Sequence, residues 1–171
     1  MGNPNPDFSY GLNLGLTYRN FDFGIFLYGV SGNDIWNNVL WWTDFNSSFE
    51  AAKSHTALYN SWTPENQNAK APIQEVGASF SSGSVPNSYF VEDGSYLRAK
   101  NTQVGYTFTP QQLERIKLDK LRIYVQAANL FTFTKYSGLD PEVSGSTVNF
   151  GIDEGTYPNQ RQFLIGVNLT F

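Results

Sequence analysis

The last ten residues, Gln162–Phe171, constrain the fold of this chain more than any other stretch. Side chains alternate across a β-strand, so every second residue lies on the same face. Here one face is apolar and the other is small or polar, with Leu164 as the one exception. A soluble sandwich also produces this alternation, but an outer-membrane β-barrel produces it routinely, because lipid covers one face and a wet lumen the other. The apolar residues are Phe163, Ile165, Val167, Leu169 and Phe171.

The cleanest alternation lies near the start of the chain, in Ser9–Tyr18, where a tyrosine stands at each end of an aliphatic band. Ten residues at about 3.3 Å each, tilted by about 45°, span roughly 23 Å, which is close to the height of an outer-membrane apolar band. Arg19 and Asn20 then form a short turn before a return strand, Phe21–Tyr28. The two stretches predict a hairpin.

Two further strands are predicted in the second half of the chain, at Tyr96–Phe108 and Leu121–Phe131. In the first of them, Leu97 and Ala99 have the opposite parity to Val104 and Tyr106. Either a bulge near Lys100–Gln103 reconciles the two halves, or the first half stands clear of the membrane.

The connections between the strands alternate between short and long. Residues 30–95 and 132–161 are much longer than the few residues that usually join two strands, whereas 109–120 is short. Single-chain outer-membrane barrels have tight periplasmic turns and long external loops. The predicted fold is therefore all-β, an antiparallel transmembrane β-barrel segment of about five strands with two long external loops. The strands are Ser9–Tyr18, Phe21–Tyr28, Tyr96–Phe108, Leu121–Phe131 and Gln162–Phe171.

The parity of the strands predicts which residues face lipid. Five strands are too few to close a barrel with an open lumen, so the first and last strands are expected to keep unpaired edges. The predicted lipid-facing residues are Leu12, Leu14, Leu16, Ile165, Val167 and Leu169, and the predicted lumen-facing residues are Asn13, Thr17, Asn168 and Thr170.

The first long connection is expected to begin with a helical piece. Asp34 has the chemistry of an N-cap, and Ile35, Val39 and Leu40 recur at helical spacing. The four tryptophans of the chain all lie in this connection, which favours a functional loop. We predict that they contact a ligand or a partner protein, since indole faces stack on sugar rings; the alternative is that they pack the loop on itself. They are Trp36, Trp41, Trp42 and Trp62.

Composition excludes several other classes of protein. The net charge of −4 argues against a nucleic-acid partner, which needs clustered lysine and arginine. There is no cysteine and only one histidine, His55, so neither disulfides nor thiolate or multi-histidine metal sites are expected. No apolar run is long enough for a transmembrane helix. Met1–Asp7 has no signal-peptide pattern, so a barrel protein with this start is expected to be the C-terminal piece of a longer chain.

Several acidic residues of the second long connection invite a sharper interpretation. Asp140 with Glu142, or Asp153 with Glu154, could form the catalytic carboxylate pair of a hydrolase, and the same four residues could bind Ca²⁺. The connection is rich in glycine and turn acids are common there, so we expect neither a catalytic residue nor a metal site. Arg98 and Lys100 either line a lumen or belong to its polar wall. The acidic residues are Asp140, Glu142, Asp153 and Glu154.

Motifs along nearly the whole chain resemble the SusC/RagA-type TonB-dependent transporters. Four stretches look like the end of such a transporter, namely Tyr96–Tyr106 (YLRAKNTQVGY), Leu121–Tyr136 (LRIYVQAANLFTFTKY), Gly138–Glu142 (GLDPE) and Tyr157–Phe171 (YPNQRQFLIGVNLTF). Three others are similar to internal family motifs in the same order, namely Gly2–Gly11 (GNPNPDFSYG), Gly32–Asn37 (GNDIWN) and Trp62–Asn66 (WTPEN).

The resemblance implies a fold, a location and partners. Family members are 22-stranded barrels with an N-terminal plug in the outer membrane of Gram-negative bacteria. They import glycans or peptides with a SusD-like surface lipoprotein, and they are not enzymes and carry no cofactor. Residues 1–171 would then be the C-terminal part of the barrel, without the plug. The implied partners are the rest of the barrel and plug, the SusD-like lipoprotein, the lipid bilayer, and TonB only through the missing N-terminal region.

Two interpretations remain open beside this one. The chain can instead be a soluble carbohydrate-binding β-sandwich module, which would fold without detergent, or an acid-pair hydrolase. The terminal Phe171 extends the apolar face of the last strand to the final residue. We predict that it is the assembly signal of the barrel; the alternative is one more lipid-facing side chain.

Overall fold

The computed structural model describes residues 2–45, 53–75, 85–114, 117–143 and 149–171. The chain divides into two compact units. The strand unit consists of residues 7–31, 95–135 and 158–171, and the loop unit consists of residues 1–6, 32–94 and 136–157. None of the described helices is both long and apolar enough to cross a membrane.

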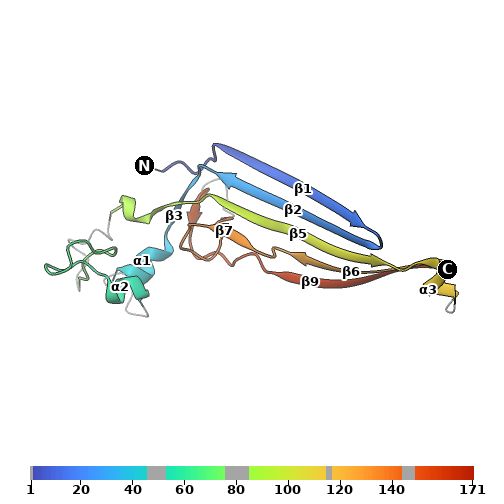
Figure 1. The fold of residues 1–171 in the computed structure, drawn as a ribbon. Coiled ribbons are helices and arrows are strands. Elements are labelled where there is room, and N and C mark those ends of the chain that lie inside the picture. The colour runs from blue at the N-terminus through green and yellow to red at the C-terminus, as the bar shows by residue number, and fades with distance from the viewer. Residues whose placement is uncertain (1, 46–52, 76–84, 115–116, 144–148) are drawn as a thin grey trace. The chain divides into compact units, whose positions relative to one another are not determined.

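The strand unit is one antiparallel sheet built from five long strands (Figure 1). In spatial order these are β1 (Phe8–Tyr18), β2 (Phe21–Ser31), β5 (Tyr96–Thr107), β6 (Lys120–Ala128) and β9 (Gln162–Thr170). A short strand, β7 (Thr132–Thr134), pairs with β5, and a short helix, α3 (Pro110–Leu113), lies between β5 and β6. The sheet is open, with β1 and β9 at its two edges in the described residues. The prediction of five antiparallel strands in an unclosed sheet is therefore confirmed.

The predicted bulge is present in β5. Phe26 of β2 pairs with Asn101, and the next residue, Leu27, pairs with Ala99. Lys100 is the extra residue on the bulged strand, which reverses the parity of everything after it. The change from the Ala99 parity to that of Val104 is thus the sequence signature of this bulge.

Strand β6 is shorter than predicted, since it ends at Ala128 and not at Phe131. Asn129 has a positive φ of 52°, a conformation that ends a regular strand and that asparagine tolerates better than most residues. Its backbone N–H donates to the carbonyl of Lys100, the bulge residue. The predicted strand had crossed this turn because Leu130 and Phe131 are apolar.

One face of the sheet is apolar across all five strands. Directly paired residues of neighbouring strands lie on the same face. Leu14 pairs with Ile25, and Val125 pairs with both Val104 and Ile165. The six residues predicted to face lipid all lie on this face, with exposed fractions between 46 and 75%. No layer of the described chain buries them.

The opposite face of the sheet carries the polar side chains. Arg122 of β6 donates from Nε to Asp22 Oδ1 of β2 at 3.0 Å, and its Nη2 also reaches Oδ2. This ion pair passes over Gly105 of the intervening strand, where an added Cβ would lie 2.5 Å from both partners. The Arg122 guanidinium also lies 4.9 Å from the ring centroid of Tyr124. Glycine therefore leaves the space that the cross-strand ion pair occupies.

Two other glycines lie beneath tyrosine rings of the neighbouring strand. Tyr10 pairs with Gly29, and Tyr124 pairs with Gly166. A Cβ at either glycine would lie 2.2 Å from the Cζ of the tyrosine opposite. Each ring thus rests against bare backbone, an arrangement that only glycine permits.

The loop unit contains a second, smaller sheet. Its middle strand, β3 (Asp34–Asn37), pairs antiparallel with β4 (Val91–Asp93) and parallel with β8 (Ile152–Asp153). Helices α1 (Val39–Asp44) and α2 (His55–Tyr59) and the 3₁₀-helix η2 (Ser88–Phe90) complete the described elements.

The predicted helical piece beginning at Asp34 is wrong for its first four residues, because helix α1 begins only after Asn38. Asp34 N–H donates to the Asn3 carbonyl and Trp36 N–H donates to the Gly151 carbonyl, both at 2.8 Å. Ile35, on the other side of the strand, is almost fully buried. Pairing with distant strands therefore overrides the local helical spacing.

Candidate ligand-contact site

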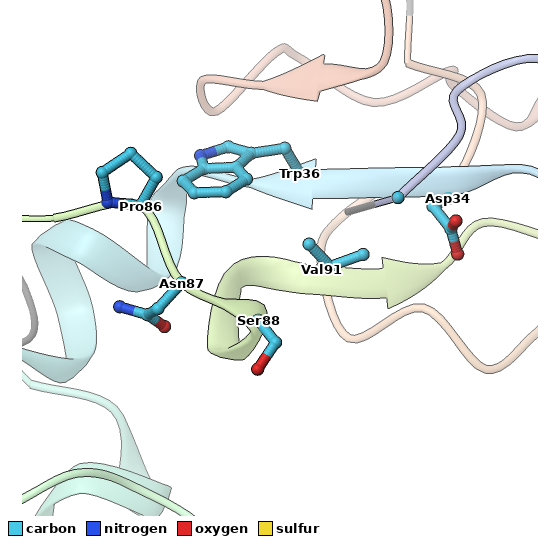
Figure 2. Close-up of a pocket in the computed structure, with 7 residues that line it drawn as sticks. Asp34, Trp36, Pro86, Asn87, Ser88 and Val91 are labelled. Carbon is cyan, nitrogen blue, oxygen red and sulfur yellow. The ribbon is translucent and has the colours of Figure 1, made fainter.

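A pocket of about 530 Å³ opens in the loop unit (Figure 2). Its volume lies within the range of about 300–1,000 Å³ usual for small-ligand sites. Strand β3 contributes two side chains, β4 contributes one, and the segment that enters η2 contributes three. The lining residues are Gly2, Asp34, Trp36, Pro86, Asn87, Ser88 and Val91.

Local contacts hold the walls of this pocket in place. The Trp36 ring stacks on the buried ring of Phe90, with 4.9 Å between the ring centroids, and Phe90 stacks in turn on Phe45. Asn87 is the N-cap of η2, because its Oδ1 accepts the Tyr89 N–H at 3.0 Å. The wall that carries Trp36 is therefore supported by aromatic packing, and the wall that carries Asn87 is supported by a helix cap.

Buried carboxylates elsewhere in the loop unit accept hydrogen bonds from tyrosines. Tyr89 donates to Asp44 Oδ2 at 2.5 Å, and Tyr136 donates to Asp153 Oδ2 at 2.6 Å. Burial, and then the hydrogen bond to the carboxylate, raises the pKa of each tyrosine well above its ordinary value near 10. Both tyrosines therefore remain neutral donors at any physiological pH.

The structure brings three of the four predicted tryptophans together. Trp36, Trp41 and Trp42 line a second hollow of about 340 Å³, in which the rings of Trp41 and Trp42 meet edge to face at 4.5 Å. Trp62 lines a different hollow, of about 430 Å³, beside Phe45. Trp42 and Trp62 are exposed, whereas Trp36 and Trp41 are half-buried. Contact of these residues with a ligand or partner stays a prediction.

The remaining predicted residues do not line the pocket. Phe171 is 85% exposed at the end of the chain, after β9, and its role as an assembly signal stays a prediction. His55 is exposed on α2, with its ring 4.6 Å from that of Tyr59. Arg98 is buried and donates from Nε to Thr132 Oγ1 at 2.8 Å, while Lys100 is the bulge residue of β5.

Two of the acidic residues considered as a catalytic pair act as turn acceptors. Asp153 accepts the backbone N–H groups of Gly155 and Thr156 in addition to the Tyr136 hydroxyl. Asp140 accepts the backbone N–H of Glu142 at 2.9 Å. Within the described ranges, no three histidine or acidic side chains lie together in the manner of a metal site.

Sequence reasoning found Trp36 but missed the polar residues beside it. Asp34, Asn87 and Ser88 converge only because β3 and the segment before η2 meet in the fold. The sequence itself gives no strand signal here, because the apolar Ile35 and Trp36 are adjacent; the alternation appears only in the burial of the folded strand.

Comparison with curated proteins identifies relatives over the entire chain, although no protein-family model matches it. TonB-dependent receptor P3 of Formosa agariphila is 38% identical over 178 residues, a match that covers 100% of this chain and 17% of the relative. The TonB-dependent receptor SusC of Bacteroides thetaiotaomicron is 33% identical, with 98% of this chain and 15% of the relative covered.

Solved structures agree with these relatives. The RagAB peptide importer matches with TM-scores of 0.78 in its open-open state and 0.79 in its closed-closed state, each at 26% identity over 98% of this chain. The match covers 17 and 18% of those chains, so this chain spans about a sixth of the proteins that it resembles. It therefore corresponds, over almost its whole length, to a segment of the SusC/RagA-type TonB-dependent receptors, as its motifs predicted.

Proposed function

We propose that this chain is part of an outer-membrane TonB-dependent nutrient importer of a Gram-negative bacterium, and that it forms the C-terminal part of the barrel. The strand unit supplies barrel wall and the loop unit supplies external loops. The rest of the barrel pairs with the open edges of β1 and β9, because an unpaired edge in lipid leaves backbone groups without partners. The chain contributes structure and substrate contacts, and no catalysis.

The observation that carries this proposal is the two-faced sheet of the strand unit. Leu16 and Ile165 are 69% and 75% exposed on one face, while the ion pair of Asp22 and Arg122 lies on the other. A soluble β-sandwich would cover the apolar face with a second sheet. In the described residues this face has no such cover, which favours lipid as its neighbour over the carbohydrate-binding sandwich module.

The proposed importer takes up glycans or peptides with a SusD-like lipoprotein on the cell surface. RagAB, a structural neighbour of this chain, is a peptide importer. The plug, and the contact with TonB that supplies energy, belong to parts of the receptor outside residues 1–171.

Thiol labelling in the intact receptor tests the membrane assignment. The chain has no cysteine of its own, so Leu14→Cys and Asn13→Cys place single probes in it on opposite faces of β1. We expect a membrane-impermeant maleimide to label Asn13→Cys through the lumen and to leave Leu14→Cys protected by lipid. Stronger labelling at Leu14→Cys would exclude the proposed orientation.

We further propose that Phe171 is part of the signal by which the barrel is assembled. Deleting Phe171 should sharply reduce the amount of receptor in the outer membrane. Phe163→Ala is the matched control, since it removes a phenyl ring of the same parity at the start of β9 and leaves the terminal residue in place. The loss of one apolar contact should cost only about 1.5–3 kcal/mol. Unchanged surface levels after the deletion would show that Phe171 has no assembly role.

A further inference from the structure

The two units carry opposite net charge. By sequence, the segments of the loop unit contain eleven acidic residues and two lysines, which is a net charge of −9. The segments of the strand unit contain four acidic and nine basic residues, a net charge of +5. A surface with this excess of negative charge attracts cationic ligands and repels anionic ones.

Neutral donors, rather than cations, satisfy several of these carboxylates. Asp44 and Asp153 accept from tyrosine hydroxyl groups. Glu92 accepts from the Asn37 amide at 2.8 Å and from the Ser137 hydroxyl at 2.7 Å. Hydrogen bonds of this kind orient a carboxylate without neutralising it, so the negative field of the loop unit persists.

The pocket combines another carboxylate of the loop unit, that of Asp34, with an apolar wall (Figure 2). Asp34 and Trp36 lie on the same side of β3, two residues and therefore about 6.6 Å apart along the strand. Val91 pairs with Trp36 from β4, and Pro86 completes the apolar wall. Asp34 Oδ2 accepts the Asn3 N–H at 2.8 Å, whereas Oδ1 has no donor among the described residues.

This arrangement has the dimensions of a lysine or arginine side chain. Such a side chain has an apolar stem and a charged head, and cations bind favourably over a tryptophan face. With its stem along Trp36, Val91 and Pro86, its head group would reach the carboxylate of Asp34. An uncharged sugar ring would use the Trp36 ring but would gain nothing from the charge, and an anionic glycan would be repelled.

We propose that this pocket receives a lysine or arginine side chain of a peptide substrate, and hence that the importer selects basic peptides. The inference rests on the proposed function and names the substrate class of the same receptor. Ser88, which also lines the pocket, supplies a hydroxyl for the peptide backbone.

Binding of three matched peptides to the intact receptor tests this proposal. The peptides have blocked ends and differ only at a central residue, which is lysine, norleucine or glutamate; norleucine keeps the four-carbon stem and lacks the ammonium group. We expect the lysine peptide to bind about tenfold more tightly than the norleucine peptide, which corresponds to about 1.4 kcal/mol. The glutamate peptide should bind most weakly.

Two variants locate the charge effect. Asp34→Asn keeps an oxygen that can accept the Asn3 N–H, and it should remove the preference for lysine while leaving the affinity for norleucine unchanged. Glu65→Gln removes one negative charge from an exposed site of the loop unit outside the pocket, and it should keep the preference. Equal loss of the preference in both variants would show a diffuse field and overturn the assignment to Asp34.

Other outcomes separate this inference from the proposed function. Equal binding of the three peptides, or no measurable binding of any, overturns the inference. Tighter binding of a neutral oligosaccharide, with an affinity that is the same in Asp34→Asn, also overturns it. If thiol labelling still places Leu14 in lipid and Asn13 in the lumen, the importer assignment stands even though the inference about basic peptides fails. If it does not, the proposed function fails, whatever the peptides do.

Discussion

The strand unit and the loop unit are stabilised in opposite ways. The strand unit is held by long backbone ladders, and it leaves its large apolar side chains exposed, as in Leu16 and Ile165. The loop unit has short strands and a core of its own, which includes the buried Phe45 and Phe90. The strand unit thus exposes an apolar face, whereas the loop unit encloses a small aromatic core.

The difference also lies in where polar groups are satisfied. In the strand unit, regular pairing satisfies the backbone, and the side chains are free to differ between the two faces. In the loop unit, Glu92 accepts hydrogen bonds from the Asn37 amide and the Ser137 backbone N–H, and Asp153 accepts one from the Tyr136 hydroxyl, all from distant segments. The loop unit therefore depends on individual side chains, whereas the strand unit depends on a pattern.

The largest expected effect comes from the aromatic core of the loop unit. Phe90→Ala removes a ring that is 2% exposed and that stacks on both Trp36 and Phe45. We expect the loop unit to lose about 3–5 kcal/mol. Hydrogen exchange in the intact receptor should show lost protection in β3 and β4, with β1 and β2 unchanged. Trp42→Ala, at an exposed ring, is the control. Equal loss of hydrogen-exchange protection in the two units after Phe90→Ala would contradict the difference between them.

A charge on the apolar face should have the next largest effect. Leu14→Arg or Val167→Arg should destabilise the receptor by about 2–4 kcal/mol near the middle of the membrane. Asn13→Arg, on the polar face of the same strand, should cost much less. Denaturant unfolding in bilayers measures the difference. Similar costs at Leu14 and Asn13 would mean that the two faces meet the same environment.

A smaller effect is expected at the tyrosine–carboxylate pairs of the loop unit. Tyr136→Phe leaves Asp153 without its hydroxyl donor, which should cost about 1–3 kcal/mol. A Tyr136→Phe receptor whose loop unit is as stable as the parent would contradict this.

The same pairs predict a pH dependence. Since the pKa of Tyr89 and of Tyr136 is raised in the folded state, both favour folding fully below about pH 10 and lose this contribution as the pH rises above it. Each tyrosine contributes a slope of at most about 1.4 kcal/mol per pH unit. Tryptophan fluorescence between pH 8 and 12 should report the decline in the loop unit. Tyr136→Phe should flatten it, and an equally steep decline in that variant would assign it to other groups.

The smallest effect is expected in the polar face of the strand unit. Asp22→Asn removes one charge of the ion pair with Arg122, whose side chains are both partly exposed. We expect a loss of about 0.5–1 kcal/mol that shrinks as salt is added. The salt dependence of the unfolding midpoint provides the measurement. A loss above 2 kcal/mol would mean that individual side chains matter here as much as in the loop unit.

The strands of the strand unit could be predicted because their information is local and periodic. Ser9–Tyr18 shows the alternation directly, and the change of parity predicted a bulge near Lys100–Gln103, which the structure places at Lys100. The end of β6 could not be predicted, because apolar residues resume at Leu130 and Phe131 beyond Asn129, whose positive φ ends the strand.

The loop unit could be predicted only in part because its contacts join residues far apart in sequence. Asn37 and Glu92 are 55 residues apart and share a hydrogen bond. Strand β3 was assigned to a helix, since four residues carry too little periodicity to decide between the two. Trp36 was recognised as a candidate contact by its chemistry, but the partnership with Asp34 exists only in the fold.

The tyrosines that lie over glycines have a consequence for how the sheet finds its pairing. Alternation cannot distinguish the native offset from a slip of two residues, because such a slip keeps every apolar side chain on its own face. In β1 and β2 it would place Tyr10 opposite Leu27 or Ser31, where a side chain fills the space that Gly29 leaves open. In β6 and β9 it would place Tyr124 opposite Leu164 or Asn168. Each tyrosine ring fits over its glycine only in the native register. These pairs therefore favour the native alignment of neighbouring strands as the sheet assembles.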